Sequence, residues 1–382
     1  MKKDWTHKKF ADIFNLNMGK TPARANEKYW TNGKYPWVSI SDLSSGNKYI
    51  TNTKEKISQE AVDETRIYLV PKGTVIMSFK LSIGKTAIAP FNLYTNEAIM
   101  AFEPKDGVDI IPDFLYYYLQ YYKWSGNRAV KGETINKAVI SNSYACIPPI
   151  SIQESIVREL DAIHGILEKK QEQLRELDNL AQAIFYEMFG DPITNPKQWE
   201  VKKLGEVAPA KAYKKEITSV NGLYWLLNLD MVESNTGIII EKLMLPMEEI
   251  GNSTTTFNNE YVLYSKLRPY LNKVVLPTDE GYCTSELVPL LPDKKCLSRE
   301  YLCYLLRSNT FVEFISNKVA GAKMPRVSMQ DFREFALPLP PLSLQQSFAA
   351  KIEAIEAQKQ AVQQSIREVE ALRAERMDHY FS

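Results

Sequence analysis

The feature that most constrains this chain is an internal repeat. Residues 147–163 read IPPISIQESIVRELDAI and residues 339–355 read LPPLSLQQSFAAKIEAI, so two segments 192 positions apart match in kind almost throughout. Self-similarity over a long interval predicts two copies of one folding unit rather than one continuous fold. The chain has 382 residues, of which 45% are hydrophobic, so each copy is long enough to bury a core of its own.

Each copy of the repeat contains signals for the start of a helix. A Pro-Pro pair ends the preceding element, and Ser151 or Ser343 follows as a candidate N-cap. Glu154 and Gln346, three residues further on, would complete a capping box in each copy. We therefore expect one helix to begin at each of these serines.

Apolar residues then recur at alternating intervals of four and three, which is the a/d pattern of a coiled coil. A helix of about 38 residues would be roughly 57 Å long, which exceeds the diameter of one small domain. We therefore favour an intramolecular coiled coil over two stripes that each pack on their own domain. The expected seam positions are Ile156, Leu160, Ile163, Leu167, Lys170, Leu174, Leu177, Ala181, Ile184 and Met188, and then Phe348, Ile352, Ile355, Lys359, Val362, Ile366, Val369, Arg373, Arg376 and Tyr380.

The segments between the helices repeat as well, more faintly. Gly73–Lys80 and Glu260–Lys266 are β-branched and aromatic runs that predict strands, whereas 112–120 and 299–307 are amphipathic and predict helices. Outside such anchors the two segments differ, for example at 21–47 against 211–237. One further motif, at an offset of 194, opens both segments: Trp5, Lys8, Lys9, Phe10, Asp12 and Ile13 correspond to Trp199, Lys202, Lys203, Leu204, Glu206 and Val207.

These patterns predict the order globule, long helix, globule, long helix. The fold class is α+β, with two mixed α/β globules separated by two long helices that form an antiparallel coiled coil, related by a pseudo-twofold repeat. The expected boundaries are 1–146 for the first globule, 147–190 for the central helix, 191–338 for the second globule and 339–382 for the C-terminal helix.

The combination of these motifs resembles the specificity subunits of Type I restriction-modification systems over the whole chain. The motifs that carry the resemblance are IPPI or LPPL followed by S-x-Q at each helix, and W-x-x-K-K at each globule. The resemblance implies that the globules are target recognition domains, each of which reads one half of a split DNA site. It also implies that the helices are spacers that dock two methyltransferase subunits, through which restriction or translocase subunits join the complex.

The sequence offers no support for catalysis by this chain. Adenine methylation needs an Asn/Asp-Pro-Pro-aromatic segment, whereas the Pro-Pro pairs here are flanked by Ile and Leu. Gly84-Lys85-Thr86 is only the tail of a Walker loop, and the four cysteines form no CxxC pair. We expect no catalytic residue, no metal site, no cofactor and four buried thiols.

Charge and hydropathy indicate the class of protein but not its ligand. The net charge is +1, and residues 1–146 carry 20 Lys and Arg against 14 Asp and Glu, an excess too modest to imply DNA binding by itself. No apolar stretch is long enough to span a membrane, so the cytoplasm is the expected location. An acidic outer face on the first helix is expected to suit partner contacts; it comprises Glu159, Asp161, Glu168, Glu172, Glu176 and Asp178.

Two other functions remain open at this point. One is a specificity subunit of a related system in which modification and cleavage lie on a single partner chain. The other is a coiled-coil scaffold that binds no DNA, for which salt-dependent duplex binding would be absent.

Candidate DNA contacts are polar or basic residues that follow a predicted strand or lie in the 132–137 and 321–326 loops. Such groups read base edges or hold phosphates when a rigid scaffold presents them. In the first globule they are Lys80, Ser82, Lys85, Thr134, Asn136 and Lys137. In the second globule they are Lys266, Arg268, Lys273, Lys323 and Arg326. The tyrosines at 116–118, 121 and 122 could form a base-stacking platform, but their helical spacing favours core packing.

Overall fold

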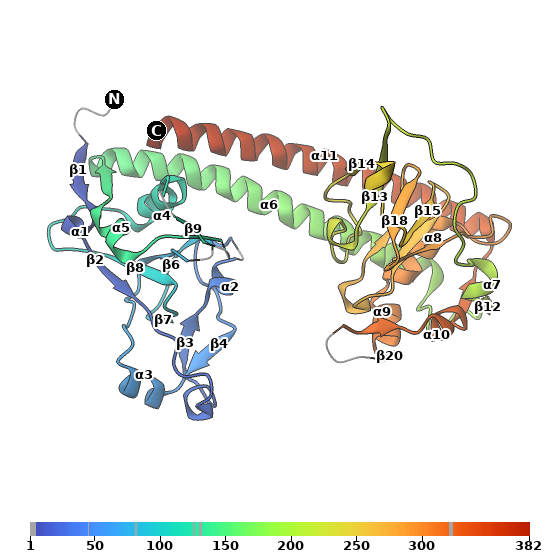
Figure 1. Ribbon diagram of the computed structural model, residues 1–382, viewed down its shortest axis with the longest axis horizontal. Coiled ribbons are helices and arrows are strands. Elements are labelled where there is room, and N and C mark those ends of the chain that lie inside the picture. Colours follow the sequence, from blue (N-terminus) through green and yellow to red (C-terminus); the bar gives the residue numbers. More distant parts are fainter. Residues whose placement is uncertain (1–4, 45, 81, 125–126, 130–131, 321–323) are drawn as a thin grey trace. The chain divides into compact units, whose positions relative to one another are not determined.

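The computed structural model describes residues 5–44, 46–80, 82–124, 127–129, 132–320 and 324–382 (Figure 1). The chain divides into two compact units, Met1–Lys169 with Ile366–Ser382, and Lys170–Ser365. Two helices of 40 residues, α6 (Ile150–Phe189) and α11 (Leu342–Phe381), each contribute one part to each unit. The expected α+β class with two long helices is confirmed.

The first unit holds two main sheets. In the four-stranded sheet every neighbouring pair is antiparallel, whereas in the three-stranded sheet β3 and β7 are parallel. In spatial order, the sheets are β2 (Phe14–Met18), β8 (Ile99–Pro104), β5 (Val75–Ser78) and β6 (Thr86–Ile88), and then β4 (Glu55–Ile57), β3 (Tyr35–Val38) and β7 (Tyr94–Thr95).

Short helices and two further strand pairs complete this unit. The remaining strands are β1 (Thr6–Lys9) with β11 (Tyr144–Ile147), and β9 (Asn127–Ala129) with β10 (Gly132–Thr134). The helices are α1 (Phe10–Ile13), η1 (Glu27–Tyr29), α2 (Ile40–Leu43), α3 (Gln59–Thr65), α4 (Pro112–Tyr121) and α5 (Lys137–Asn142).

The second unit repeats the same kinds of strand pairing. Its sheets are β14 (Leu243–Pro246), β13 (Leu223–Leu227), β18 (Gly281–Thr284) and β15 (Thr254–Phe257), then β17 (Val274–Val275), β16 (Val262–Ser265) and β19 (Leu287–Leu290). Its strand pairs are β12 (Glu200–Lys203) with β22 (Ala336–Leu339), and β20 (Val319–Ala320) with β21 (Arg326–Val327). Its helices are α7 (Leu204–Val207), η2 (Leu229–Met231), η3 (Met247–Glu249), η4 (Pro269–Leu271), α8 (Arg299–Arg307), α9 (Asn309–Ser316) and α10 (Met329–Arg333).

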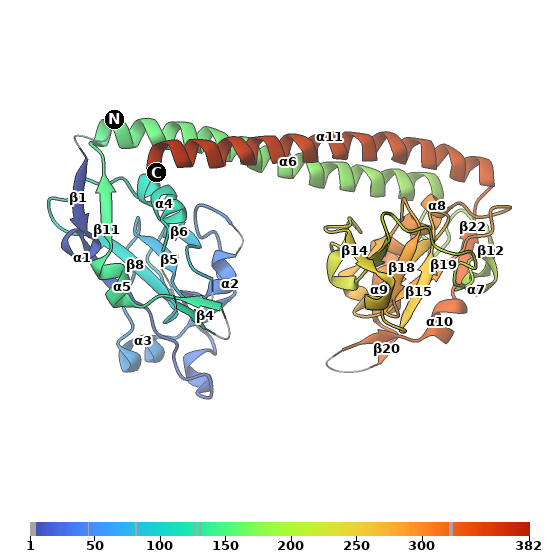
Figure 2. The ribbon, with the colours of Figure 1, turned by 45° about the horizontal axis from the view of Figure 1, so that its top comes forward.

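The W-x-x-K-K motifs form the strand that closes each globule. In the first unit β1 pairs antiparallel with β11, the strand that leads into α6, and Figure 2 shows the two side by side. In the second unit β12 pairs in the same way with β22, which leads into α11. The first and last strands of each globule therefore meet at the base of a long helix.

The tyrosine-rich helix α4 is part of the core of its unit. Tyr116, Tyr117 and Tyr118 are buried, together with residues of the four-stranded sheet and of α6. Core packing of these tyrosines, rather than a base-stacking platform, is confirmed. The four cysteines are free, but only Cys283 and Cys303 are buried, so the expectation of four buried thiols was half wrong.

The predicted capping boxes were wrong, because a different residue of the motif organises each helix start. Helices α6 and α11 begin at Ile150 and Leu342, one residue before each serine. The proline carbonyls accept the first bonds: Pro149 O accepts from Gln153 N at 3.1 Å, and Pro341 O accepts from Gln345 N at 3.2 Å. Each serine therefore lies within the first turn rather than at the cap.

Gln153 and Gln345 are fully buried and make equivalent hydrogen bonds in the two units. Gln153 Nε2 donates to the carbonyls of Pro148 and Asp109, and its Oε1 accepts from Ile111 N just before α4. Gln345 Nε2 donates to the carbonyls of Pro340 and Cys296, and its Oε1 accepts from Ser298 N just before α8. One glutamine thus joins the start of a long helix to the start of a globule helix in each unit.

Most of the expected seam is buried, and its C-terminal end in α6 lies one residue later than predicted. Ile156, Leu160 and Ile163 are buried, as are Phe348 and Ile352 in α11. Beyond Ala181 the buried residues are Phe185 and Phe189 instead of Ile184 and Met188. The 3.6-residue turn of an α-helix drifts from a 3.5-residue repeat, and both phenylalanines pack on Tyr301 and Phe348.

The two long helices pack antiparallel within each unit. Arg376, near the end of α11, pairs with Glu159, near the start of α6, in the first unit. In the second unit Lys359 Nζ lies 2.8 Å from a carboxylate oxygen of Asp178. Both pairs involve carboxylates that we expected on an outward acidic face. Asp161 is likewise paired, with Lys48, so half of that expected face is wrong.

The region expected to differ between the globules retains a common framework. Strands β3 and β13 each have an antiparallel neighbour, β4 or β14, and a parallel neighbour, β7 or β18. Trp37 and Trp225 are buried at corresponding places on β3 and β13. The spacing of Trp37 and Asp42, repeated by Trp225 and Asp230, is the sequence signal that would have revealed this strand.

Candidate nucleic-acid interface

The turn between β5 and β6 presents three of the candidate contacts of the first unit, Lys80, Ser82 and Lys85. Ser78 holds this turn together, because its backbone N donates to Lys85 O at 2.9 Å and its Oγ accepts from Lys85 N at 3.2 Å. Gly84 adopts a φ of +86°, a conformation that favours glycine, and its N donates to Ser78 O at 3.0 Å. The turn is therefore a fixed support for its lysines.

A second segment of the first unit lies against this turn. Ile135 N donates to Phe79 O at 3.1 Å, which brings the residues after β10 beside those after β5. Asn136 and Lys137 are exposed at the start of α5, where the Asn136 side chain accepts from Val139 N as the N-cap. Thr134 is the last residue of β10, so the expected loop is partly a strand. The structure therefore brings the two groups of first-globule candidates together.

The second unit brings its candidates together in the same way. Arg268 N donates to Pro325 O at 2.8 Å, and Val327 N donates to Lys266 O at 2.9 Å, so the segment after β16 runs beside β21. Arg268 is exposed and adopts a left-handed conformation with φ of +50°. Lys323 lies outside the described residues.

Two of the second-unit candidates are already engaged within the protein. Lys273 Nζ donates to Leu229 O at 2.9 Å. Arg326 pairs with Glu286, with 3.0 Å between Nη2 and Oε1, and this hydrogen bond raises the pKa of Arg326 above its usual value. Arg326 remains exposed, so a phosphate would have to compete with Glu286 for its guanidinium.

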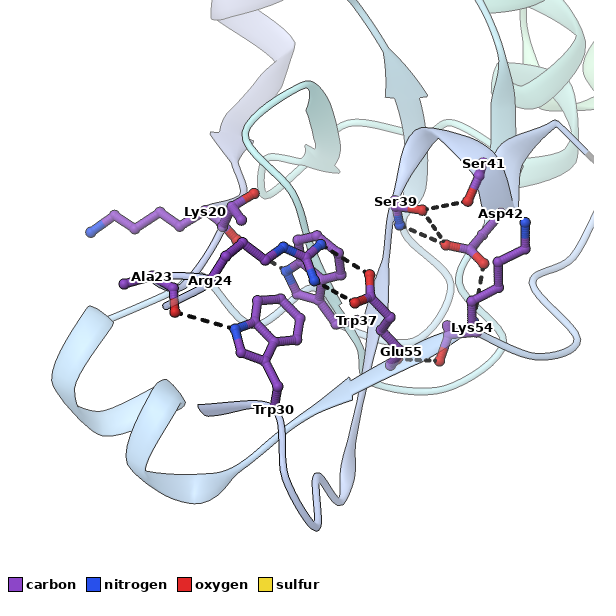
Figure 3. Close-up of polar contacts among 12 residues, drawn as sticks. Lys20, Ala23, Arg24, Trp30, Trp37, Ser39, Ser41, Asp42, Lys54 and Glu55 are labelled. Atoms are coloured by element: carbon purple, nitrogen blue, oxygen red, sulfur yellow. Dashed lines mark hydrogen bonds and ion pairs between the residues drawn. The ribbon is translucent and has the colours of Figure 1, made fainter. Parts of the chain in front are cut away.

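A cluster around Arg24 escaped prediction (Figure 3). The guanidinium lies 3.9 Å from the ring centroid of Trp30 and 4.9 Å from that of Trp37, and it pairs with Glu55 through two hydrogen bonds. The bond to Glu55 raises the pKa of Arg24. Trp37 Nε1 donates to Lys20 O at 3.0 Å, and Trp30 Nε1 donates to Ala23 O at 3.3 Å. These contacts fix residues 20–30 against β3 and β4.

The second unit has a simpler cation–aromatic contact at the corresponding tryptophan. Lys242 Nζ lies 4.8 Å from the ring centroid of Trp225 and 2.6 Å from a carboxylate oxygen of Asp279. The hydrogen bond from Lys242 lowers the pKa of Asp279. No sequence motif predicts either cluster, because the cation, the tryptophan and the carboxylate of each cluster are brought together only by tertiary contacts.

The described residues offer no site for a metal ion, since no group of three or more His, Cys, Asp or Glu side chains among them could hold one. Within the same part of the chain, no helix combines the length and apolar character that crossing a membrane requires.

Comparisons with known proteins match the chain along most of its length. The family model described as "Type I restriction modification DNA specificity domain" matches twice, at residues 2–177 and 196–371. The MjaIX specificity subunit of a type I restriction enzyme from Methanocaldococcus jannaschii is 26% identical, covering 92% of this chain and 86% of the relative. The EcoDI specificity subunit from Escherichia coli is 22% identical, covering 95% of this chain and 84% of the relative.

A solved structure has the same fold over nearly the whole chain. It comes from work on the structural basis of complex assembly and conformational transition of the type I R-M system. The TM-score is 0.54 at 17% identity, covering 99% of this chain and 98% of the other. The repeated globules and long helices are therefore a known arrangement.

Proposed function

The chain belongs to the Type I restriction modification DNA specificity family, and from this premise we propose that it reads a bipartite DNA target, one half with each globule. The chain is the specificity subunit of a Type I restriction-modification complex. Its function is to recognise DNA, and the cytoplasm, where chromosomal DNA is accessible, is the proposed place of action.

The observation that carries this proposal is the paired segment in each unit. The residues after β5 lie beside those after β10, and the residues after β16 lie beside β21, held by backbone hydrogen bonds in both cases. The scaffold is the same, whereas the side chains differ: Lys80, Ser82 and Lys137 in the first unit, Lys266 and Arg268 in the second. A shared support with different polar groups suits the reading of two different half-sites.

We assign the chemistry to partner chains. The sequence has neither the glycine-rich cofactor loop nor the Pro-Pro-aromatic segment of an adenine methyltransferase. Two methyltransferase subunits, and restriction or translocase subunits bound through them, would supply methylation and cleavage.

The long helix α6 offers a surface for such partners. Ile152, Ile166 and Leu180 are 43%, 44% and 48% exposed and recur every 14 residues, which is two heptads. Glu168, Glu172 and Glu176 are exposed as well, so the outer surface of α6 carries both apolar and acidic side chains. Helices with a complementary apolar face and basic residues would fit this surface.

The test is a map of methylated adenines in the host genome, with and without this chain. The proposal expects one motif, consisting of two short sequences separated by an unspecified spacer, to lose methylation when the chain is deleted. Complementation with the intact chain should restore that motif alone. Persistence of every methylated motif after the deletion would reject the proposal.

A further inference from the structure

A pocket of about 360 Å³ in the first unit is lined by two cationic side chains, and no carboxylate is among the described residues that line it. Four segments that are distant in sequence meet there: the end of α2, the β5–β6 turn, α4 and α11. The groups that define its chemistry are Ser44, Lys85, Thr86, Tyr116, Gln120 and Arg373. Two cations, three hydroxyl groups and an amide form the polar part of this lining.

The charge of Lys85 is not neutralised within the pocket. Its Nζ donates to Ser44 Oγ at 2.8 Å, a neutral partner, and none of the ion pairs among the described residues includes it. The same lysine lies on the fixed β5–β6 turn that carries Lys80 and Ser82. Its position is therefore set by the backbone rather than by a counter-ion.

Arg373 brings the second charge from α11. Its Nη2 donates to Gln120 Oε1 at 2.5 Å, and Gln120 Nε2 donates in turn to Thr86 Oγ1 at 2.9 Å. The Nε of Arg373 is sheltered from solvent and has no hydrogen-bond partner among the described residues. A sheltered donor on a charged group is costly unless a ligand or partner satisfies it.

The helix pair does not itself require an arginine at this place. The position 192 residues earlier is Ala181, which is buried in the second unit. An alanine suffices in one copy of the repeat, so the arginine of the other copy has a different reason to be there. Arg376, one turn further on, pairs with Glu159 and shows how a helix arginine is neutralised in this protein.

From these observations we propose that the pocket between Lys85 and Arg373 binds a phosphate group. A phosphate oxyanion accepts from a guanidinium, an ammonium and hydroxyl groups at once, and it supplies the negative charge that the lining lacks. The phosphate can belong to the DNA backbone or be free in solution. The DNA source rests on the proposed function, because it makes α11 a contributor to phosphate contacts beside the first globule.

The test compares the intact chain with Arg373→Ala, Lys85→Met and a matched control, Lys351→Ala. Lys351 is an exposed cation on the same helix outside the pocket, so its loss removes the same charge. Alanine at position 373 copies the counterpart at 181, and Lys85→Met alters the pocket from the globule side. Circular dichroism of each variant verifies folding before binding is measured.

One arm uses inorganic phosphate, titrated against the full chain and followed by the width of its ³¹P resonance at constant ionic strength. Each pocket variant should weaken binding about tenfold or more, and Lys351→Ala should not. The other arm measures duplex binding by the chain with its methyltransferase partner as salt rises. Loss of one backbone contact should reduce the slope of log affinity against log salt by about 0.9.

A reduced slope in both pocket variants supports the proposal and identifies a DNA phosphate as the ligand. An unchanged slope with weakened phosphate binding supports it and identifies free phosphate. If neither arm distinguishes the pocket variants from Lys351→Ala, the proposal is wrong. This holds even if Arg373→Ala weakens assembly with an acidic partner protein, because the pocket would then bind that protein and not a phosphate. Failure of the intact complex to bind DNA specifically would reject the proposed function, while the phosphate arm would still decide on the pocket.

Discussion

Among the described residues, one lysine is buried in each unit within a similar polar network, and the two lysines come from different parts of the chain. In the first unit Tyr117 Oη donates to Asp161 of α6 at 2.6 Å, and Asp161 pairs with the buried Lys48. In the second unit Tyr304 Oη donates to Glu356 of α11 at 3.2 Å, and Glu356 pairs with the buried Lys359.

The two networks connect different elements, because one lysine belongs to the globule and the other belongs to a long helix. Lys48 follows α2 in the globule and also pairs with Asp113 at 2.6 Å, so it attaches the globule to α6. Burial lowers the pKa of Lys48, but the hydrogen bonds to Asp113 and Asp161, together with the attraction of their negative charges, raise the pKa overall, so the ammonium stays charged. Lys359 belongs to α11 and also pairs with Asp178 of α6, so it joins the two long helices. The polar network is thus present in both copies of the repeat, but it connects different elements in each copy.

The largest effect is expected when both globules stay intact and only the two long helices are shortened. Removal of one heptad from each helix, residues 168–174 and 362–368, shortens each by about 10 Å. B-DNA advances about 3.4 Å per base pair, so the spacer between half-sites should contract by up to about three base pairs. That contraction is also about a third of a helical turn, so we expect weakened or absent methylation as well.

Sequencing of methylated adenines measures this outcome, with circular dichroism as the check on folding. Removal of residues 168–174 alone is the control, because it mismatches the helices and should destabilise them. A folded double deletion that methylates the original spacing at full efficiency would show that the helices do not measure the site.

The feature that the two units share most closely is the buried glutamine at the start of each long helix. Gln153→Leu and Gln345→Leu should each lower the free energy of unfolding by about 3 kcal/mol, because each leaves buried backbone groups without partners. Gln346→Ala, beside Gln345 but exposed, should change it by less than about 0.5 kcal/mol. Urea unfolding of the full chain compares the three. If only one of the two leucine variants lowered the free energy of unfolding, the two buried glutamines would not have the same structural role.

Replacement of the two buried lysines should destabilise different parts of the protein. Lys48→Met and Lys359→Met should each cost about 2 kcal/mol, less than a fully buried pair, because the carboxylates remain partly exposed. Hydrogen exchange should increase in the first globule near α2 and α4 for Lys48→Met, and in α6 and α11 near Asp178 for Lys359→Met. The same exchange pattern in both variants would remove the distinction between the two networks.

The smallest expected effect concerns alkaline pH. Burial, aided by the neighbouring carboxylates, raises the pKa values of Tyr117 and Tyr304, whereas an unfolded tyrosine titrates at about 10. The stabilising contribution is complete below about pH 10 and is lost as pH rises through the folded pKa values. Tyr117→Phe and Tyr304→Phe should each flatten the fall in melting temperature above pH 10. A fall as steep as that of the intact chain would exclude these tyrosines as its cause.

Much of the fold could be predicted because the repeat and the helical periodicity are written in the order of residue types. The strands around Val75–Ser78 and Val262–Ser265, the helices α4 and α8, and the antiparallel helix pair all follow from such patterns. Beyond Ala181 the buried positions of α6 lie one residue later than predicted, because Phe185 packs in an aromatic cluster with Tyr301. Tyr301 is more than 100 positions away in the sequence, so the periodicity of α6 does not reveal this contact.

The candidate interface could be predicted only as a set of polar loops. The sequence places Lys80 and Lys85 after a strand. It does not reveal the backbone hydrogen bond from Ile135 N to Phe79 O, or the hydrogen bond from the Lys273 side chain to a backbone carbonyl. The Arg24 cluster and the pocket at Arg373 join residues that are far apart in the chain, so pattern alone could not find them.

The central claim is that each globule reads its own half of the target, and an exchange of one globule tests it most directly. Residues 1–146 would be replaced by the corresponding globule of a relative, and the methylated motif would be determined by sequencing in the presence of the methyltransferase partner. We predict that one half-site changes, while the other half-site stays as it was. If both halves changed together, or if neither changed, the two globules would not be separate readers of DNA.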